Sequence, residues 1–274
     1  MSTIRREFVK SLFQKRTYIG WGGLFVIPFL IMLAFRFSSG PQGDQGGQQD
    51  VGGFIFSLVK SNGLFLVVAA LAVMSTFFLP LLASMSGSYT IAGEAENGTL
   101  RTTLMQPVRR STLLMSKWLV SNIYVGICLL SLGIASLIAG GAVFGLKATP
   151  LFTGQTVSVG HALGLVAASY AFVFLGMMCV VSLAVLFSTL TNSSLTAVAV
   201  ALVLVIVMEI LGAIPQFHFL QPYLFPSKFM EWTNFLQSPV QWSPVIKALI
   251  NFAVWIVGMT GLAYLRFRSK DILS

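Results

Sequence analysis

From His161 to Phe187 the chain reads HALGLVAASYAFVFLGMMCVVSLAVLF, without a single Asp, Glu, Lys or Arg. As an α-helix these residues, about 27 in number, would be about 40 Å long, which exceeds the ~30 Å hydrocarbon core of a bilayer. An uncharged run of this length is typical of a membrane-spanning helix and is rare in a soluble core. The segment therefore predicts that the protein crosses a membrane.

The rest of the sequence has the same apolar character. Of its 274 residues, 56% are hydrophobic and only 9% are charged, and the mean hydropathy is +0.85. A soluble domain has about 25% charged residues, because its surface must face water. The composition therefore excludes a soluble globular protein. With only 2 cysteines, it also excludes a small disulfide-stabilised scaffold.

Further stretches are long and apolar enough to cross a bilayer. The predicted spans are six, namely 18–37, 64–85, 118–144, 161–187, 195–214 and 244–264. We therefore predict an all-α, polytopic integral membrane protein in which residues 1–274 form one transmembrane domain. An N-terminal interfacial elbow helix and a cytoplasmic coupling helix complete the expected fold.

The distribution of Lys and Arg gives the expected orientation. Twelve of the 17 lie before the first span, between the second and third spans, or after the last span. They are Arg5, Arg6, Lys10, Lys15, Arg16, Arg101, Arg109, Arg110, Lys117, Arg266, Arg268 and Lys270. Because cytoplasmic loops carry an excess of positive charge, both termini are expected in the cytoplasm. The net charge of +9 is not gathered on a polar domain, so we expect no nucleic-acid partner.

Two segments outside the spans have recognisable patterns. In residues 1–17, Ile4, Phe8 and Leu12 recur at a spacing of four among basic residues. This pattern predicts an amphipathic elbow helix on anionic headgroups, and a basic disordered leader is the alternative. Residues 215–243 are rich in aromatic side chains and proline. They are expected on the outer side, either as short helices that dip into the outer leaflet or as a plain aromatic belt.

The loop between the second and third spans, residues 88–117, has the features of a short helix of its own. Asn97 and Gly98 break one helix, and Thr99 can cap the next. The apolar face of that second helix is formed by Leu100, Leu104 and Met105, and the helix is expected to end at Pro107. A short helix with one apolar face suits the groove of a partner protein. The alternative is a loop that is merely solvated.

This loop resembles the one that precedes the third helix in the membrane subunits of ABC-2 type ATP-binding-cassette transporters. That family has an acidic residue, a Gly-Thr-Leu step, a proline with basic residues, and then a lysine. The matching positions here are Glu94, Glu96, Gly98, Thr99, Leu100, Pro107, Arg109, Arg110 and Lys117. The resemblance extends in coarse form to the whole chain, from the basic elbow to the basic end at Arg266–Ile272.

The resemblance implies a permease subunit that pairs with a second copy of itself or a homologous permease, and with two cytosolic ATPase subunits. Residues 94–107 would be the coupling segment. The expected ATPase-coupling residues are Glu94, Glu96, Gly98, Thr99, Leu100, Leu104, Pro107, Arg109 and Arg110. The sequence has no G-x-x-x-x-G-K phosphate loop, so ATP and Mg²⁺ would be bound by the partner ATPase. We expect no cofactor and no catalytic residue in this chain.

Glu209 is the only acidic residue within a predicted span. If that helix begins at the cytoplasmic face near Leu195, Glu209 lies about 21 Å above it, in the outer half of the bilayer. An ionised carboxylate is costly there, so Glu209 is expected either to line a transport route or to cap the outer helices or pair with Lys228. No group of His, Cys, Asp and Glu has metal-ligand spacing, and Cys128 and Cys179 are expected as apolar free thiols.

The resemblance implies the plasma-membrane subunit of an ATP-driven transporter, and within it the short outer loops and apolar spans favour export. An amphipathic drug, a peptide or a lipid-linked molecule would suit its apolar surfaces. The alternatives are a polytopic enzyme that acts on lipids and an ion-coupled secondary carrier. The enzyme would need clustered Asp or His at the membrane face, and the carrier would need more charge within the membrane.

Overall fold

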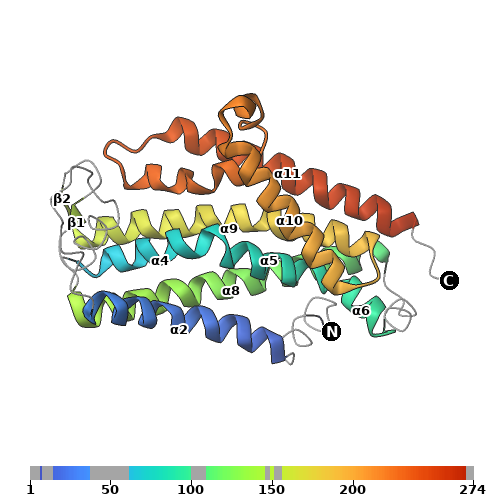
Figure 1. Ribbon diagram of the computed structural model, residues 1–274, viewed down its shortest axis with the longest axis horizontal. Helices are drawn as coiled ribbons and strands as arrows, with labels where there is room; N and C mark the ends of the chain where they lie inside the picture. The colour runs from blue at the N-terminus through green and yellow to red at the C-terminus, as the bar shows by residue number, and fades with distance from the viewer. Residues whose placement is uncertain are drawn as a thin grey trace.

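The structure, a computed structural model, describes residues 7, 15–37, 62–99, 109–145, 149–150 and 156–269. Its α-helices are α2 (Lys15–Phe37), α4 (Leu64–Thr76), α5 (Phe78–Ser88), α6 (Ala92–Glu96), α8 (Arg110–Phe144), α9 (Val159–Leu190), α10 (Ser194–Ala213) and α11 (Trp242–Ser269). Two 3-10 helices follow α10, η1 (Pro215–Leu220) and η2 (Pro226–Leu236). One short antiparallel pairing joins β1 (Thr149–Pro150) to β2 (Thr156–Val157). The long helices lie side by side in an elongated bundle, which confirms the predicted all-α fold (Figure 1).

Each of the six predicted spans is helical, and 64–85 contains two helices, but not every one of these helices qualifies as a span by itself. Four helices, α8, α9, α10 and α11, are long and apolar enough to cross a membrane. The pair α4 and α5 qualifies only when taken together, which raises the number to five, and α2 has a shorter apolar run, Gly20–Ala34. Among the described residues, length and composition therefore support an integral membrane protein with four or five spans.

The predicted span 64–85 is divided into two helices at Phe77. The axes of α4 and α5 differ in direction by 52°, and Phe77 has a non-helical backbone, with φ −131° and ψ −50°. Pro80 lies in the first turn of α5 and has no N–H group to donate to the carbonyl of Thr76, as a continuous helix would require. The proline therefore explains why one apolar stretch forms a bent pair.

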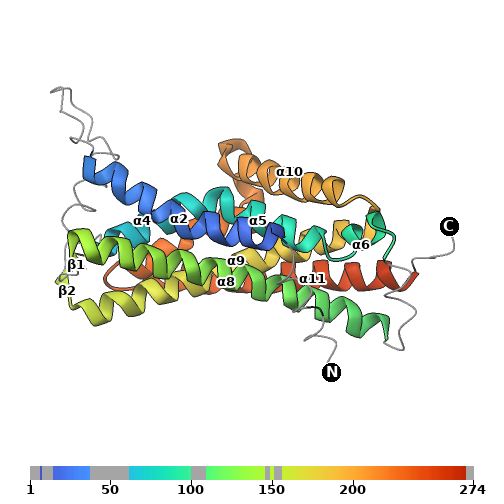
Figure 2. The ribbon, with the colours of Figure 1, turned by 90° about the horizontal axis from the view of Figure 1, so that it is seen from below.

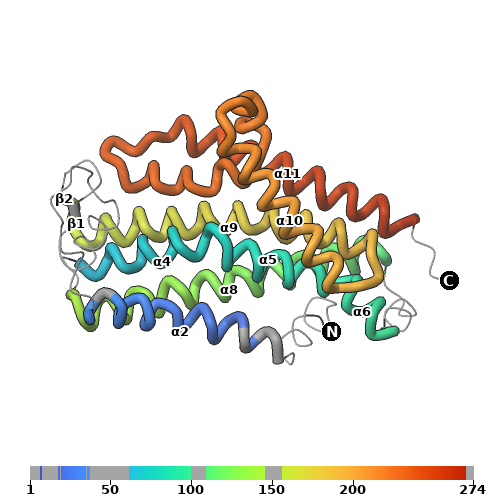
Figure 3. The backbone as a smooth tube through the Cα atoms, viewed as in Figure 1, coloured from blue at the N-terminus to red at the C-terminus, as the bar shows by residue number. Residues whose placement is uncertain are grey.

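The centre of the bundle is α9. It packs against α5, α8, α10, α11 and η2, and in its most apolar stretch 67% of the residues are buried, compared with 22% in α10 and 17% in α11. The tube in Figure 3 shows α9 running between the α4–α5 pair and α11. The outer helices instead leave much of their apolar surface uncovered. Such surface suits contact with lipid or with another membrane subunit.

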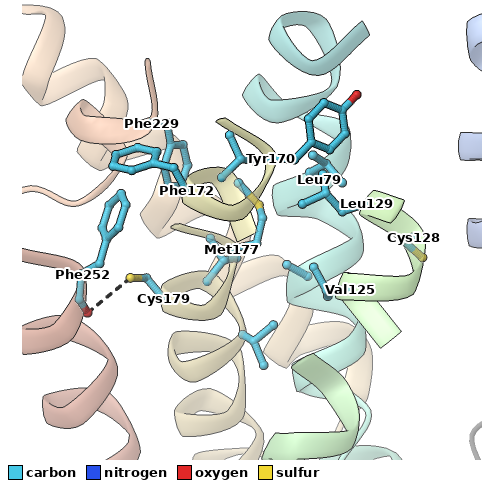
Figure 4. Packing of buried hydrophobic residues seen from close by; sticks show 14 of the residues in the cluster. Leu79, Val125, Cys128, Leu129, Tyr170, Phe172, Met177, Cys179, Phe229 and Phe252 are labelled. Atoms are coloured by element: carbon cyan, nitrogen blue, oxygen red, sulfur yellow. Dashed lines mark hydrogen bonds between the residues drawn. The ribbon is translucent and has the colours of Figure 1, made fainter. Parts of the chain in front are cut away.

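The aromatic segment after α10 is only partly a surface feature. Phe225, Phe229, Trp232 and Phe235 are buried, and η2 packs against α9 and α11. Figure 4 shows Phe229 beside Phe172 of α9 and Phe252 of α11; the ring centroids of Phe172 and Phe252 are 5.3 Å apart. The exposed aromatic side chains are Phe217, Phe219, Tyr223 and Trp242. The segment therefore contains two short helices, and four of its aromatic side chains face inward.

Candidate functional site

The described residues of the predicted coupling segment lie at one end of the bundle, which we call the α6 end. There α5 and α9 end, α8 and α10 begin, and α6 joins the end of α5 (Figure 2). Residues Ile91, Ala92 and Glu94 are buried. The start of this segment is therefore packed against the helices, whereas residues 96–99 are exposed.

A single hydroxyl group holds the turn between α5 and α6. Ser188, near the end of α9, accepts hydrogen bonds from the backbone N–H groups of Ile91 (3.1 Å) and Ala92 (2.8 Å). Its Oγ also donates to the carbonyl of Ser88, at 2.7 Å. A serine hydroxyl has one donor hydrogen and two acceptor lone pairs. The hydroxyl group therefore forms all three hydrogen bonds available to it, and all three attach this turn to α9.

The close approach of α5 to α9 in the same region depends on a glycine. A Cβ atom on Gly87 would lie 2.7 Å from the Cβ of Ala184 and 2.8 Å from the carbonyl oxygen of Val181. Real side chains do not tolerate such distances to a backbone oxygen. Gly87 therefore permits the contact that brings the α5–α6 turn within reach of α9.

A buried ion pair connects α6 with α8. The Nζ atom of Lys117 lies 2.7 Å from Oε1 of Glu94, and the exposed fractions of the two side chains are 3% and 7%. Glu7 also approaches Lys117, at 3.2 Å, with 16% of its side chain exposed. Because removal of one buried partner leaves the other charge uncompensated, the pair fixes α6 to the first part of α8. Glu7 adds a link to the N-terminal region.

A second carboxylate connects α6 with α10. Oε2 of Glu96 accepts a hydrogen bond from the backbone N–H of Ser194, at 2.9 Å, and another from the hydroxyl group of the same residue. Ser194 is the first residue of α10. A carboxylate at this position satisfies an N–H that has no partner within the helix and interacts favourably with the helix dipole. Glu94 and Glu96 thus fasten one short helix to two long ones.

Helix α6 ends at a glycine with a left-handed backbone. Gly98 has φ +68°, and the N–H of Thr99 donates to the carbonyl of Glu94 at 2.9 Å. Glycine adopts this conformation at little cost, so it is well suited to end a helix. The break predicted at Gly98 is therefore present. The remaining predicted coupling residues, Leu100, Leu104 and Pro107, lie outside the described residues.

The basic pair of the predicted coupling segment lies at the start of α8. Arg109 is the extended residue before the helix, and Arg110 is the first residue within it. The guanidinium group of Arg110 donates to the backbone carbonyl of Arg268, at 3.3 Å. Arg268 belongs to the last turn of α11. The two arginines of the loop are therefore brought next to the C-terminal end of α11.

Glu209 lies on α10 and is half-buried. Within the part of the chain that the structure describes, no hydrogen bond or ion pair engages its carboxylate. Lys228 pairs instead with Glu231, at 3.5 Å. The expected alternative of a Glu209–Lys228 pair is therefore wrong. The two cysteines are free and buried, as predicted.

Sequence reasoning missed some of the residues that build the α6 end. Ser188 is one of many serines in apolar stretches, and nothing in its local sequence marks it. Glu7 lies within the predicted elbow, whose pattern consists of its apolar and basic residues. Lys117 was placed in the family pattern, but its pairing with Glu94 joins residues 23 positions apart in the chain. No periodicity predicts such a contact.

The apolar helices and the fastened turn at the α6 end define a polytopic α-helical membrane protein with a specialised polar end. The chain belongs to the ABC-2 family of transporter proteins, whose pattern matches residues 1–272. It is thus the membrane component, or permease, of an ATP-binding-cassette transporter, a class that associates with an ATPase subunit. No curated protein matches the sequence significantly.

Proposed function

We propose that this permease is driven through its α6 end by a separate ATPase. The observation that carries the proposal is that Glu94 joins α6 to α8 while Glu96 joins it to α10. A force applied to the coupling segment beyond Thr99 would therefore reach two membrane helices at once. Residues 94–107 are the proposed coupling segment, with Leu100, Leu104 and Pro107 forming the surface that contacts the ATPase. ATP and Mg²⁺ are bound by that partner.

The proposed assembly contains two ATPase subunits and two permeases, either two copies of this chain or one copy with a homologue. The uncovered apolar surfaces of α10 and α11 support contact with lipid and with a second permease. In this arrangement α2 supplies the sixth span, and both termini lie in the cytoplasm, as the distribution of Lys and Arg favours. The plasma membrane is the proposed location.

The proposed direction of transport is export. The proposed substrate is an amphipathic drug, a peptide or a lipid-linked molecule. The described part of the chain is composed almost entirely of apolar helices, and its large exposed side chains are mostly aliphatic or aromatic. A substrate with apolar surface is stabilised by contact with such side chains, because both apolar surfaces are then removed from water. Within this proposal, the half-buried Glu209 supplies the polar contact of the transport route.

The direct test is co-expression of the tagged permease with an ATP-binding-cassette ATPase from the same genome. We expect the ATPase to be retained with the permease on purification and to hydrolyse ATP in the purified complex. A matched sample in which the phosphate-loop lysine of the ATPase is replaced should retain the complex and lose hydrolysis. A permease that purifies without any ATPase and transports without ATP would contradict the proposal.

The role of Glu209 gives a separate prediction. Glu209→Gln keeps the volume of the side chain and removes its charge, so we expect ATP hydrolysis per folded complex to fall about tenfold, equivalent to about 1.4 kcal/mol in the barrier. The melting temperature should stay that of the unmodified protein. Glu231→Gln, which affects a partly exposed carboxylate paired with Lys228, is the control and should change hydrolysis little. A lower melting temperature with normal hydrolysis would instead assign Glu209 to anchoring the outer helices.

A further inference from the structure

The chain between η1 and η2 is attached to the middle of α11. We call residues 221–225 the outer turn. The side-chain amide of Asn251 donates hydrogen bonds to the carbonyl groups of Pro222, at 2.8 Å, and Tyr223, at 3.1 Å. The indole N–H of Trp255 donates to the same carbonyl of Tyr223, at 2.7 Å. Two side chains of α11 thus form three hydrogen bonds with the backbone of the outer turn, which lies beside this helix in Figure 1.

The position of these hydrogen bonds along α11 places them within the membrane. The helix is long and apolar enough to cross a bilayer, and its last turn carries Arg266 and Arg268. Asn251 and Trp255 precede Arg266 by 15 and 11 positions, which is about 22 and 16 Å along a helix. With Arg266 at one edge of a hydrocarbon core about 30 Å thick, Trp255 lies near the midplane and Asn251 lies in the outer half. The outer turn therefore reaches into the hydrocarbon.

At this depth the outer turn and α11 depend on each other for hydrogen bonds. A carbonyl group of non-helical backbone is costly in hydrocarbon, because no water is present to donate to it. The amide of Asn251, which is the only Asn or Gln in α11, needs a partner for the same reason. Separation of the turn from α11 would leave both sides unpaired, so we expect the two to move as one unit.

The attachment of the outer turn to α10 is weaker. The side-chain amide of Gln221 donates to the carbonyl of Gly212, at 2.6 Å, and Gly212 lies in the last turn of α10. Among the described residues this is the one hydrogen bond that joins the turn to α10. The chain that connects them, η1, is kinked at Phe217, whose backbone is non-helical with φ −102° and ψ 18°. The turn can therefore separate from α10 by bending at this kink.

We propose that the outer turn is a latch that moves with α11 and closes against the end of α10. Gln221 forms the closing contact. When α10 moves, the bond from Gln221 to Gly212 breaks and the chain bends at Phe217, while the bonds from α11 persist. Separation follows this path because one hydrogen bond is lost in place of three.

The latch lies next to the proposed transport route. Glu209 precedes Gly212 by 3 positions, or nearly one turn of α10. Since α10 begins at the α6 end, Gly212 and the latch lie beyond Glu209, toward the outer side. The inference rests on the proposed function, in which Glu209 lines the route and the ATPase moves α10 through the contact of Glu96 with Ser194.

Distances between pairs of spin labels, measured by electron paramagnetic resonance, test the latch in the purified permease–ATPase complex. The chain lacks its two native cysteines, and one label is attached at Tyr223→Cys, because this side chain is 70% exposed and the backbone carbonyl is retained. The second label is attached at Leu265→Cys on α11 or at Val203→Cys on α10, both of which are exposed positions. When ATP and vanadate are added, we expect the distance to α11 to stay constant and the distance to α10 to increase by several ångströms.

A substitution at Gln221 tests the latch in the permease alone. Gln221→Leu keeps most of the side-chain volume and removes the bond to Gly212. The distance between the labels at positions 223 and 203 should therefore increase without ATPase or ATP. Gln216→Leu, which changes an exposed glutamine of η1, is the control and should leave this distance unchanged.

Asn251→Leu combined with Trp255→Phe removes the three hydrogen bonds between α11 and the outer turn, so it should broaden the distribution of distances between the turn and α11. A constant distance to α10 in a complex that hydrolyses ATP would overturn the latch and leave the proposed function intact. An increased distance to α11 would also overturn it, because the turn would then follow α10. If the permease binds no ATPase, the proposed function fails, and equal distances in the Gln221 variant and its control would overturn the latch independently.

Discussion

Replacing Lys117 by methionine lowers the stability of the permease by about 3–5 kcal/mol, the largest effect expected of a single substitution at the α6 end. Methionine fills the space of the lysine stem but leaves the buried carboxylate of Glu94 without its cation, which lies at 2.7 Å. Glu7 loses its partner as well. The loss is measured as a lower melting temperature of the purified protein and as reduced ATP hydrolysis in the complex.

An exposed ion pair provides the matched control for this substitution. Lys228 and Glu231 lie 3.5 Å apart with more than a fifth of each side chain exposed, so Lys228→Met should cost no more than about 1 kcal/mol. Adding Glu94→Gln to Lys117→Met should restore part of the stability, because it removes the uncompensated charge. Equal effects of Lys117→Met and Lys228→Met would contradict the buried ion pair.

The second large effect is expected from Ser188→Ala. The substitution leaves the buried N–H groups of Ile91 and Ala92 without an acceptor and removes the donor to the carbonyl of Ser88. Each unsatisfied buried N–H group costs about 1–3 kcal/mol, so a loss of at least about 2 kcal/mol is expected from the two together. The melting temperature should fall, and proteolysis near the α5–α6 turn should become faster as the turn detaches from α9.

Ser269→Ala is the control for the loss of a serine hydroxyl. Ser269 is exposed at the end of α11, and its Oγ bonds only to carbonyl groups of its own helix. Its removal should change stability by no more than about 0.5 kcal/mol. A Ser188→Ala protein with the melting temperature of the unmodified chain would show that the turn is held by other contacts.

The positions of the helices could be predicted because a bilayer requires long apolar stretches. The spans predicted from hydropathy are all helical in the structure, from α2 to α11. It could not identify α9 as the central helix, because stretches that contact lipid and stretches that contact protein are equally apolar. The bend at Phe77 was missed although Pro80 was visible, since a proline within a long apolar run often only kinks a helix. The inward packing of Trp232 was missed for a similar reason, because aromatic clusters suit both interfaces and cores.

The candidate site could be predicted in part. The loop pattern singled out Glu94, Glu96 and Gly98, and the structure places all three in one fastened turn. Their partners could not be predicted, because Lys117 and Ser194 lie on other helices and come together only when the bundle forms. The same holds for Arg110 and Arg268, which are separated by 158 positions. The local sequence therefore indicates which residues are unusual, but their contacts depend on how the helices pack.

The central claim, that an ATPase acts on the segment beyond α6, is tested most directly by site-specific crosslinking. A cysteine is placed at Leu100 in a chain whose two native cysteines, Cys128 and Cys179, are replaced by alanine. The cysteine is labelled with a thiol-reactive photocrosslinker, which inserts into C–H bonds of any protein in contact with it, and the complex with the ATPase is irradiated. Ser158, exposed at the N-terminal end of α9, supplies the control position. The account predicts a crosslinked permease–ATPase product from Leu100 and none from Ser158. An active complex that gives no crosslink at Leu100 or Leu104, or that crosslinks at Ser158 instead, would contradict it.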